Sequence, residues 1–262
     1  MINTLLIIDP QNDFCDKAGA LSVPGAHDDC LRLSSLIKRN DQKLDTIHVT
    51  MDSHHLYHIA HPIFWLDRNN ENPKPLTIIT LKDIKNGEYR SAVPQYQLYA
   101  QEYVATLEKT GKYNLAIWPP HCLIGSWGHN VYKPLAEALW EWESTIPGRV
   151  VDYTSKGSNV RTEHYSAIRS EVSDPADPGS RTNFALIERL KTADNIAIAG
   201  QALSHCVANT VRDLVTTIPV EKLIVLTDVS SNVPGFEHLG SEFLEEARSI
   251  GVRLMSSEEF LA

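Results

Sequence analysis

Residues 196–215 read IAIAGQALSHCVANTVRDLV, and this stretch decides the fold. It opens with an apolar run, residues 196–199, whose length and following Gly200 are typical of a buried strand. Apolar residues then recur at helical spacing: Val207, Val211, Leu214 and Val215. Cys206 is therefore expected near a helix start, where free backbone N–H groups and a partial positive charge favour a thiolate and an adjacent oxyanion. This placement makes Cys206 a candidate nucleophile.

The composition is that of a globular protein. The chain has 262 residues, 42% of them hydrophobic and 22% charged, and this length suits one large α/β domain or two small ones. A formal net charge of −9 without any basic run argues against nucleic acid or an anionic membrane as a partner. The N-terminal MINTLLIIDP does not resemble a signal peptide, and no apolar run approaches transmembrane length. The four cysteines lack CxxC spacing, so free thiols and a cytoplasmic location are expected.

Short apolar runs alternate with helical patterns along the chain. Strands are expected at 4–9, 46–51, 149–153, 196–199, 222–226 and 252–255, and helices at 27–40, 135–142, 183–191 and 239–250. This alternation predicts a parallel sheet that is covered by helices on both faces. Residues 62–117, with a short strand at LTIIT and a tyrosine-rich helix, are expected to elaborate a single domain spanning 1–262.

Chemically active side chains follow several of these strands. Asp9, Asp52 and Cys206 all fall at the carboxyl ends of predicted strands, where ligands bind in parallel sheets. Taken alone, Asp9 would equally suit a cap of the following loop. Lys156 follows another predicted strand, and a lone lysine is usually solvated. Beside a cysteine and an aspartate it can hold the carboxylate and lower the pKa of the thiol, which would give an Asp–Lys–Cys set for acyl transfer.

A metal site is predicted from the segment DSHHLYHIAH, residues 52–61. Asp52 and His54, two residues apart just past a strand, can converge on one cation. His121, in the proline-stiffened turn WPPHCLIG, can complete the site from afar. A histidine-rich loop can equally be surface decoration. Such mixed nitrogen and oxygen ligands suit Zn²⁺, Fe²⁺ or Mn²⁺.

Five blocks of sequence carry a family resemblance. In chain order they are DPQNDFC (9–15) with GALSVPGA (19–26), DSHHLYH (52–58), WPPHCLIG (118–125), KGSN (156–159) with EHYSAI (163–168), and GQALSHCV (200–207). Together they resemble the nicotinamidase branch of the isochorismatase-like cysteine hydrolases. The resemblance implies a three-layer αβα fold with a mostly parallel, doubly wound, Rossmann-like sheet of six strands.

The resemblance also implies roles for the residues around the nucleophile. Cys206 matches the nucleophile, Asp9 the general base that accepts the thiol proton, and Lys156 the partner of both. The backbone N–H groups of Ala202 and Cys206 match an oxyanion hole. In the family a cis peptide bond precedes the matching alanine, and here that bond joins Gln201 to Ala202.

A divalent metal ion and an aromatic pocket are implied as well. Zinc is the first expectation, with iron and manganese as alternatives. The implied metal ligands are Asp52, His54 and His121, with His58 as a candidate fourth ligand or supporting group. Phe14 and Trp118 match the aromatic walls that enclose a pyridine ring.

These correspondences predict hydrolysis of nicotinamide to nicotinate and ammonia through an acyl thioester on Cys206. A related cysteine hydrolase acting on another amide or carbamoyl group is the first alternative, and a non-enzymatic ligand-binding relative is the second. A dinucleotide-dependent dehydrogenase is disfavoured because no GxGxxG follows the first strand. The expected partners are a small amide substrate and further copies of the chain.

Two positions beside the nucleophile depart from the family pattern. Ser204 stands where an acidic residue is common, and Gln201 replaces a usual aliphatic residue. The insertion at 67–117 and an added loop at 169–182 are candidates for a lid or an oligomer contact.

Overall fold

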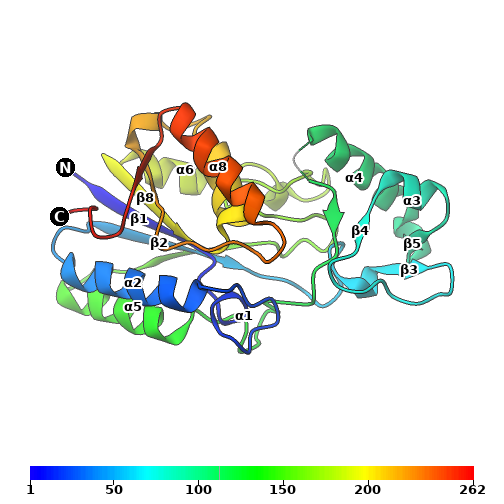
Figure 1. The fold of residues 1–262 in the computed structure, drawn as a ribbon, viewed down its shortest axis with the longest axis horizontal. Helices are drawn as coiled ribbons and strands as arrows, with labels where there is room; N and C mark the ends of the chain where they lie inside the picture. The colour runs from blue at the N-terminus through cyan, green and yellow to red at the C-terminus, as the bar shows by residue number, and fades with distance from the viewer. Residues whose placement is uncertain (112) are drawn as a thin grey trace.

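The computed structural model describes residues 1–111 and 113–262. At its centre lies a sheet of six parallel strands in the order β10-β9-β8-β1-β2-β7 (Figure 1). Their bounds are β1 Asn3–Ile8, β2 Thr46–Asp52, β7 Asp152–Lys156, β8 Asn195–Gly200, β9 Leu223–Leu226 and β10 Arg253–Met255. The predicted parallel, six-stranded α/β architecture is confirmed.

Helices cover both faces of the sheet, as predicted. In Figure 1, α2 (Ala26–Arg39) and α5 (Lys133–Thr145) lie together below the sheet, and α6 (Phe184–Lys191) and α8 (Glu237–Ser249) lie above it. Because the sheet is covered on both sides, β1 and β8 are nearly continuous apolar runs with buried side chains. Two shorter helices, α1 (Asn12–Cys15) and α7 (Ala208–Leu214), follow β1 and β8.

The strand order reverses between β1 and β8. The chain starts at β1, adds β2 and β7 on one side, and then returns to place β8, β9 and β10 on the other side of β1. In doubly wound sheets, ligands bind at such a switch point, outside the carboxyl ends of the strands. Asp9 follows β1 and Cys206 follows β8, so the topology itself brings these two residues to one place.

The elaboration between β2 and β7 forms a separate layer of small elements at the right of Figure 1. Its bounds are β3 Trp65–Asp67, β4 Ile78–Ile79, α3 Leu81–Lys85, β5 Tyr89–Ser91, α4 Gln97–Thr110 and β6 Leu115–Ala116. Strand β3 pairs with β5, and β4 pairs with β6, both antiparallel. The strand expected at LTIIT is therefore the two-residue β4, outside the main sheet. The Trp118 backbone N–H donates to the Ala60 carbonyl at 2.7 Å. This bond joins the two ends of the elaboration, where it leaves and re-enters the main domain.

Near the site, one predicted strand boundary was wrong, and the expected helix start at Cys206 has an added feature. The strand expected at 149–153 is β7, three residues later, so Lys156 is its last residue and does not follow it. The helix expected to begin near Cys206 is preceded by a π-helical turn, Leu203–Val207, and Cys206 lies inside this turn. β7 is an edge strand that reads DYTSK and is only partly buried, so the apolar pair at 150–151 just before it gave the stronger strand signal.

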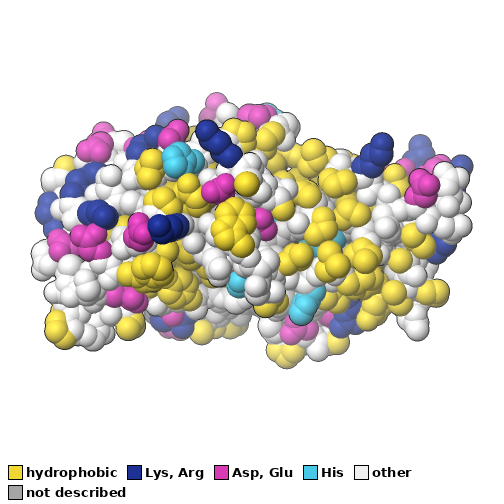
Figure 2. Space-filling view, turned by 90° about the horizontal axis from the view of Figure 1, so that it is seen from below, with side chains coloured by type: hydrophobic (Ala, Val, Ile, Leu, Met, Phe, Trp, Pro, Cys, Tyr) yellow, Lys and Arg dark blue, Asp and Glu magenta, His cyan; other side chains and the backbone are white. Residues whose placement is uncertain are grey.

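On the surface seen from below, apolar side chains cover much of the half that carries the elaboration, and charged side chains of both signs are interspersed over the other half (Figure 2). Among the described residues, none of the helices combines the length and the apolar character that a membrane span requires.

Candidate active site

Lys156 joins the side chains that the strand ends bring together. Its ammonium lies 2.8 Å from Asp9 Oδ2 and 3.1 Å from Asp52 Oδ1, and it donates to the His164 carbonyl at 2.8 Å. The Cys206 Sγ lies 3.8 Å from the same nitrogen. Burial opposes the charge of Lys156, but Asp52 and Asp9 outweigh it and raise the pKa of the ammonium well above its usual value. Lys156 is therefore a permanent cation among two carboxylates and a thiol.

Asp9 sits where a carboxylate can receive a proton. It has a left-handed backbone conformation with φ 44°, which turns the chain at the end of β1. The Thr50 hydroxyl donates to Oδ1 at 2.6 Å, whereas Oδ2 receives no aligned hydrogen bond from any residue that the structure describes. Burial raises the pKa of Asp9, although Lys156 opposes the rise. Oδ2 thus keeps acceptor capacity close to the thiol.

The Cys206 side chain is buried, and this burial raises the pKa of its thiol well above the usual value. Lys156 acts in the opposite direction without reversing the shift. Lys156 thus lowers the pKa of the thiol, as expected from the sequence, but desolvation outweighs this effect. Cys206 rests as a thiol and needs a base to become a nucleophile.

Three of the predicted metal-site residues lie in contact. Asp52 Oδ2 is 2.9 Å from His54 Nε2 and 3.4 Å from His121 Nε2. Burial opposes its ionisation, but His54 and Lys156 lower the pKa of Asp52 well below the usual value, so this carboxylate is ionised. Asp52 therefore presents one oxygen to Lys156 and the other to the histidines.

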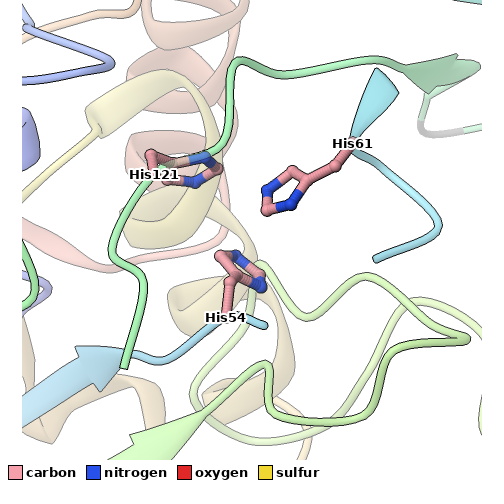
Figure 3. Close-up of side chains that lie close together, drawn as sticks. All are labelled: His54, His61 and His121. Carbon is pink, nitrogen blue, oxygen red and sulfur yellow. The ribbon is translucent and has the colours of Figure 1, made fainter. Parts of the chain in front are cut away.

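The third histidine of the cluster is His61, not His58. His54, His61 and His121 point toward one another in Figure 3, and one nitrogen from each lies within 4.8 Å of the others. Both ring nitrogens of His58 are engaged elsewhere: Nε2 donates to the Thr162 carbonyl at 3.1 Å, and Nδ1 accepts the Ala60 N–H at 3.2 Å. His58 supports the cluster by packing its ring against His54, with centroids 4.4 Å apart.

The chemistry of this cluster fits a divalent metal ion. Buried Nε2 of His61 has no hydrogen-bond partner among residues 1–111 and 113–262, which is costly for a polar atom unless something binds it. Burial and the neighbouring His121 lower the pKa of His61 to about 3, so its imidazole is in the neutral form that ligates metals. Three imidazoles and one carboxylate form a donor set typical of zinc and other transition metals.

A small pocket connects the nucleophile to the metal cluster. Cys206 and Ala202 line it together with Asp52 and His121, and Phe14 and Trp118 form parts of its wall. Phe14 lies edge-on to His121, and the Trp118 indole N–H donates to the Tyr165 hydroxyl at 3.0 Å. The lining combines aromatic side chains with a few polar groups, which is typical of sites that bind small molecules.

The pocket also contains polar residues that were not predicted from the sequence. Glu163 lines it, with Oε1 accepting the His164 N–H at 2.9 Å and Oε2 without a hydrogen-bond partner among the described residues. His205 lines it as well, and burial lowers the pKa of this imidazole to about 3. Glu163 belongs to the block EHYSAI and His205 precedes the nucleophile, so their positions in motifs were the signal that could have found them.

The turn before the nucleophile has the expected backbone. The Gln201–Ala202 peptide bond is cis. Ala202 is the residue from which the π-helical turn containing Cys206 begins, and its carbonyl accepts the N–H groups of His205 and Val207 at 3.1 Å each. Ala202 and Cys206 are thereby held on one tight turn at the edge of the pocket.

The chain resembles known proteins in sequence and in fold. No family model matches the chain. The nicotinamidase of Saccharomyces cerevisiae is 25% identical over 209 residues, which are 80% of this chain and 79% of that protein. The solved structure of the yeast nicotinamidase superposes with a TM-score of 0.68 over 97% of this chain and 99% of that chain, at 20% identity. The fold is that of the nicotinamidases.

Other solved relatives agree with this assignment. A nicotinamidase/pyrazinamidase of Acinetobacter baumanii superposes with a TM-score of 0.67 at 20% identity and covers 99% of this chain and 98% of its own. The pyrazinamidase of Pyrococcus horikoshii, solved in complex with zinc, has a TM-score of 0.59 at 20% identity, with coverage of 98% and 99%. The resemblance to nicotinamidases predicted from the sequence is confirmed.

Proposed function

We propose that this protein is a metal-dependent nicotinamidase that hydrolyses nicotinamide to nicotinate and ammonia. The observation that carries the proposal is one small aromatic pocket with an Asp9–Lys156–Cys206 cluster at one end and a buried histidine–carboxylate cluster at the other. Similarity to a nicotinamidase over 80% of the chain supports the same activity.

In the proposed reaction Asp9 Oδ2 removes the proton from the Cys206 thiol as the sulfur attacks the carboxamide carbon. The raised pKa of the thiol requires this base, and the raised pKa of Asp9 makes its carboxylate a stronger base. Lys156 remains protonated throughout and stabilises the negative charge, whether it lies on the carboxylate or on the sulfur. The N–H groups of Ala202 and Cys206 would stabilise the tetrahedral oxyanion.

The later steps reuse the same residues. The carbon–nitrogen bond breaks as Asp9 returns its proton to the leaving nitrogen, and ammonia departs from an acyl thioester on Cys206. Asp9 then takes a proton from water, which attacks the thioester carbon. The carbon–sulfur bond breaks, nicotinate is released and the thiol regains the proton.

We assign the metal to Asp52, His54, His61 and His121, with zinc as the first expectation. When bound, a divalent cation supplies a Lewis acid that can hold the ring nitrogen of the substrate or a water beside it. Lys156 contributes to this end of the pocket too, because it holds the second oxygen of Asp52 and orients the carboxylate. Phe14 and Trp118 would enclose the faces of the ring.

The proposal is tested by ammonia release from a panel of amides. We expect turnover of nicotinamide and far weaker turnover of benzamide, which has the same carboxamide but no ring nitrogen. Chelation should abolish activity, and added zinc should restore it. Release of ammonia from carbamoyl substrates without turnover of nicotinamide would overturn the assignment.

The role of the nucleophile is tested by substitution. Cys206→Ala should remove activity, and the matched control Cys30→Ala should retain it, because Cys30 is a buried free cysteine on α2. Intact-mass analysis after rapid quenching should detect an acyl adduct on the wild-type chain alone. An active Cys206→Ala variant would contradict the mechanism.

The homo-oligomer expected from the sequence stays a prediction. Apolar side chains gather over the elaboration in Figure 2, and this is the surface on which we expect a second copy to dock.

A further inference from the structure

Gln201 is a buried amide at the turn between β8 and the nucleophile, and its side chain is 1% exposed. Its Nε2 donates to Asp29 Oδ2 at 3.0 Å, and its Oε1 accepts the Ser231 N–H at 3.3 Å. Its backbone N–H donates to the Ile8 carbonyl at 2.8 Å, at the end of β1. One residue is therefore bonded to α2, to β1 and to the segment after β9.

The partner of this amide is itself fixed. Asp29 is buried on α2, and its other oxygen accepts from the Arg32 guanidinium at 2.7 Å. Arg32 also donates to the Asp228 carbonyl at 2.6 Å, in the segment that contains Ser231. Gln201 thus closes a ring of hydrogen bonds between α2 and the segment that follows β9.

This ring holds the residues on both sides of Ala202. Ser231 donates its N–H to the Gln201 side chain and accepts the Leu203 N–H on its carbonyl at 2.8 Å. The hydroxyl of Ser204 accepts the Val233 N–H at 3.1 Å. Ser204, the other position that departs from the family pattern, thus also binds the segment after β9. Ala202 lines the pocket, whereas Gln201 is not among the residues that line it.

We propose that Gln201 is a positioning residue that holds the Ala202 N–H in place for the oxyanion, through its hydrogen bonds to Asp29 and Ser231. The inference rests on the proposed function. An aliphatic residue at this position could pack there but could form neither bond, so the anchoring depends on the glutamine amide. An oxyanion donor acts only when it is correctly placed. Loosening its turn should therefore weaken the stabilisation of the transition state and leave ground-state binding intact.

The test compares Gln201→Met with wild type. Methionine has similar length and suits a buried site, but it removes both hydrogen bonds. We expect kcat for nicotinamide to fall about 10- to 100-fold, below the full loss of an oxyanion donor, with KM nearly unchanged. Affinity for the aldehyde analogue of nicotinamide, whose adduct with Cys206 places an oxygen at the same site, should fall in parallel.

Two measurements separate positioning from general damage. Alkylation of Cys206 by iodoacetamide forms no oxyanion, so its rate should be unchanged in Gln201→Met, as should the affinity for nicotinate. Equal losses of kcat, alkylation rate and nicotinate affinity would overturn the proposal, because they indicate a general collapse of the pocket. An unchanged kcat would overturn it as well.

A pair of variants at Asp29 keeps the test independent of the folding of Gln201→Met. Asp29→Asn keeps an oxygen that can accept from Gln201 and should retain kcat within a few-fold, whereas Asp29→Leu removes the acceptor and should reproduce the loss. Equal kcat in the two variants would contradict the proposal. If the wild-type protein turns over no nicotinamide, the proposed function fails. The role of Gln201 is then still decided by whether Gln201→Met lowers the affinity for the aldehyde analogue while the alkylation rate of Cys206 stays unchanged.

Discussion

At the scale of single residues, the candidate site depends on one buried cation. Lys156 is 4% exposed, and its ammonium contacts both Asp9 and Asp52, which are also buried. In a medium of low polarity, an unpaired carboxylate is strongly destabilising. The two buried carboxylates that contact this ammonium therefore require its positive charge. Lys156 therefore stabilises the fold as well as the proposed chemistry.

Replacing Lys156 by methionine should destabilise the protein by about 3–5 kcal/mol, because it leaves two buried carboxylates without a counter-charge. Urea unfolding of the metal-free protein at neutral pH measures this change, and activity should be lost. The matched control is Lys38→Met, which breaks the exposed 2.8 Å ion pair with Glu141 and should change stability little. Equal stability of the two variants would contradict this account.

At the scale of elements, the metal cluster depends on the close approach of the carboxyl ends of β2 and β7. Asp52 pairs with Lys156 in the parallel register of these strands, and Gly157 follows at once with φ +85°. A Cβ on Gly157 would lie 2.8 Å from Asp52 Oδ1 and 3.0 Å from His54 Cε1. Glycine is therefore required both by the backbone conformation and by the space that the two ligands occupy.

Gly157→Ala should displace Asp52 and His54 and so reduce the metal content of the purified protein, measured by elemental analysis. Gly148→Ala is a matched control, since Gly148 has φ +86° but nothing within 4 Å of an added Cβ. Both variants carry a similar backbone penalty, but only Gly157→Ala should lose metal and recover activity in excess zinc. Equal metal content in the two would count against this position of the site.

At the scale of the whole molecule, the sheet and the elaboration together enclose a set of neutral histidines. His61 precedes the elaboration, and Trp118 and His121 follow it. The two ends of the elaboration therefore bring Trp118 and His121 to the pocket and His61 to the histidine cluster. Burial lowers the pKa of His164 and of His205 to about 3, because the folded chain excludes the water that would solvate a charged imidazole.

Stability should therefore fall as the pH drops below about 6.5, the usual pKa of histidine in an unfolded chain. Between about 6.5 and 3 the unfolded state binds protons at His164 and His205 that the folded state excludes, so acid favours unfolding. Each histidine contributes up to about 1.4 kcal/mol per pH unit. Urea unfolding of metal-free protein from pH 7.5 to 5 measures the slope. His205→Phe should make it shallower, and an unchanged slope would contradict the prediction.

The sequence by itself determined the elements whose signals are local. Apolar runs and helical spacing predicted the parallel sheet, and the strand ends predicted that Asp9, Asp52 and Cys206 would meet. Such patterns depend on residues a few positions apart, so they can be recognised without knowledge of the fold. The five motif blocks then predicted the resemblance to nicotinamidases, which the yeast relative confirms.

Only the tertiary structure decided which groups face one another across the chain. His58 is nearer to His54 in sequence than His61 is, but hydrogen bonds to Thr162 and Ala60 occupy His58 and leave His61 Nε2 to the cluster. The raised pKa of Cys206 follows from burial, which no local motif encodes. Gln201 meets Asp29 across 172 positions of sequence. These features depend on backbone direction and desolvation, and both arise when distant segments pack together.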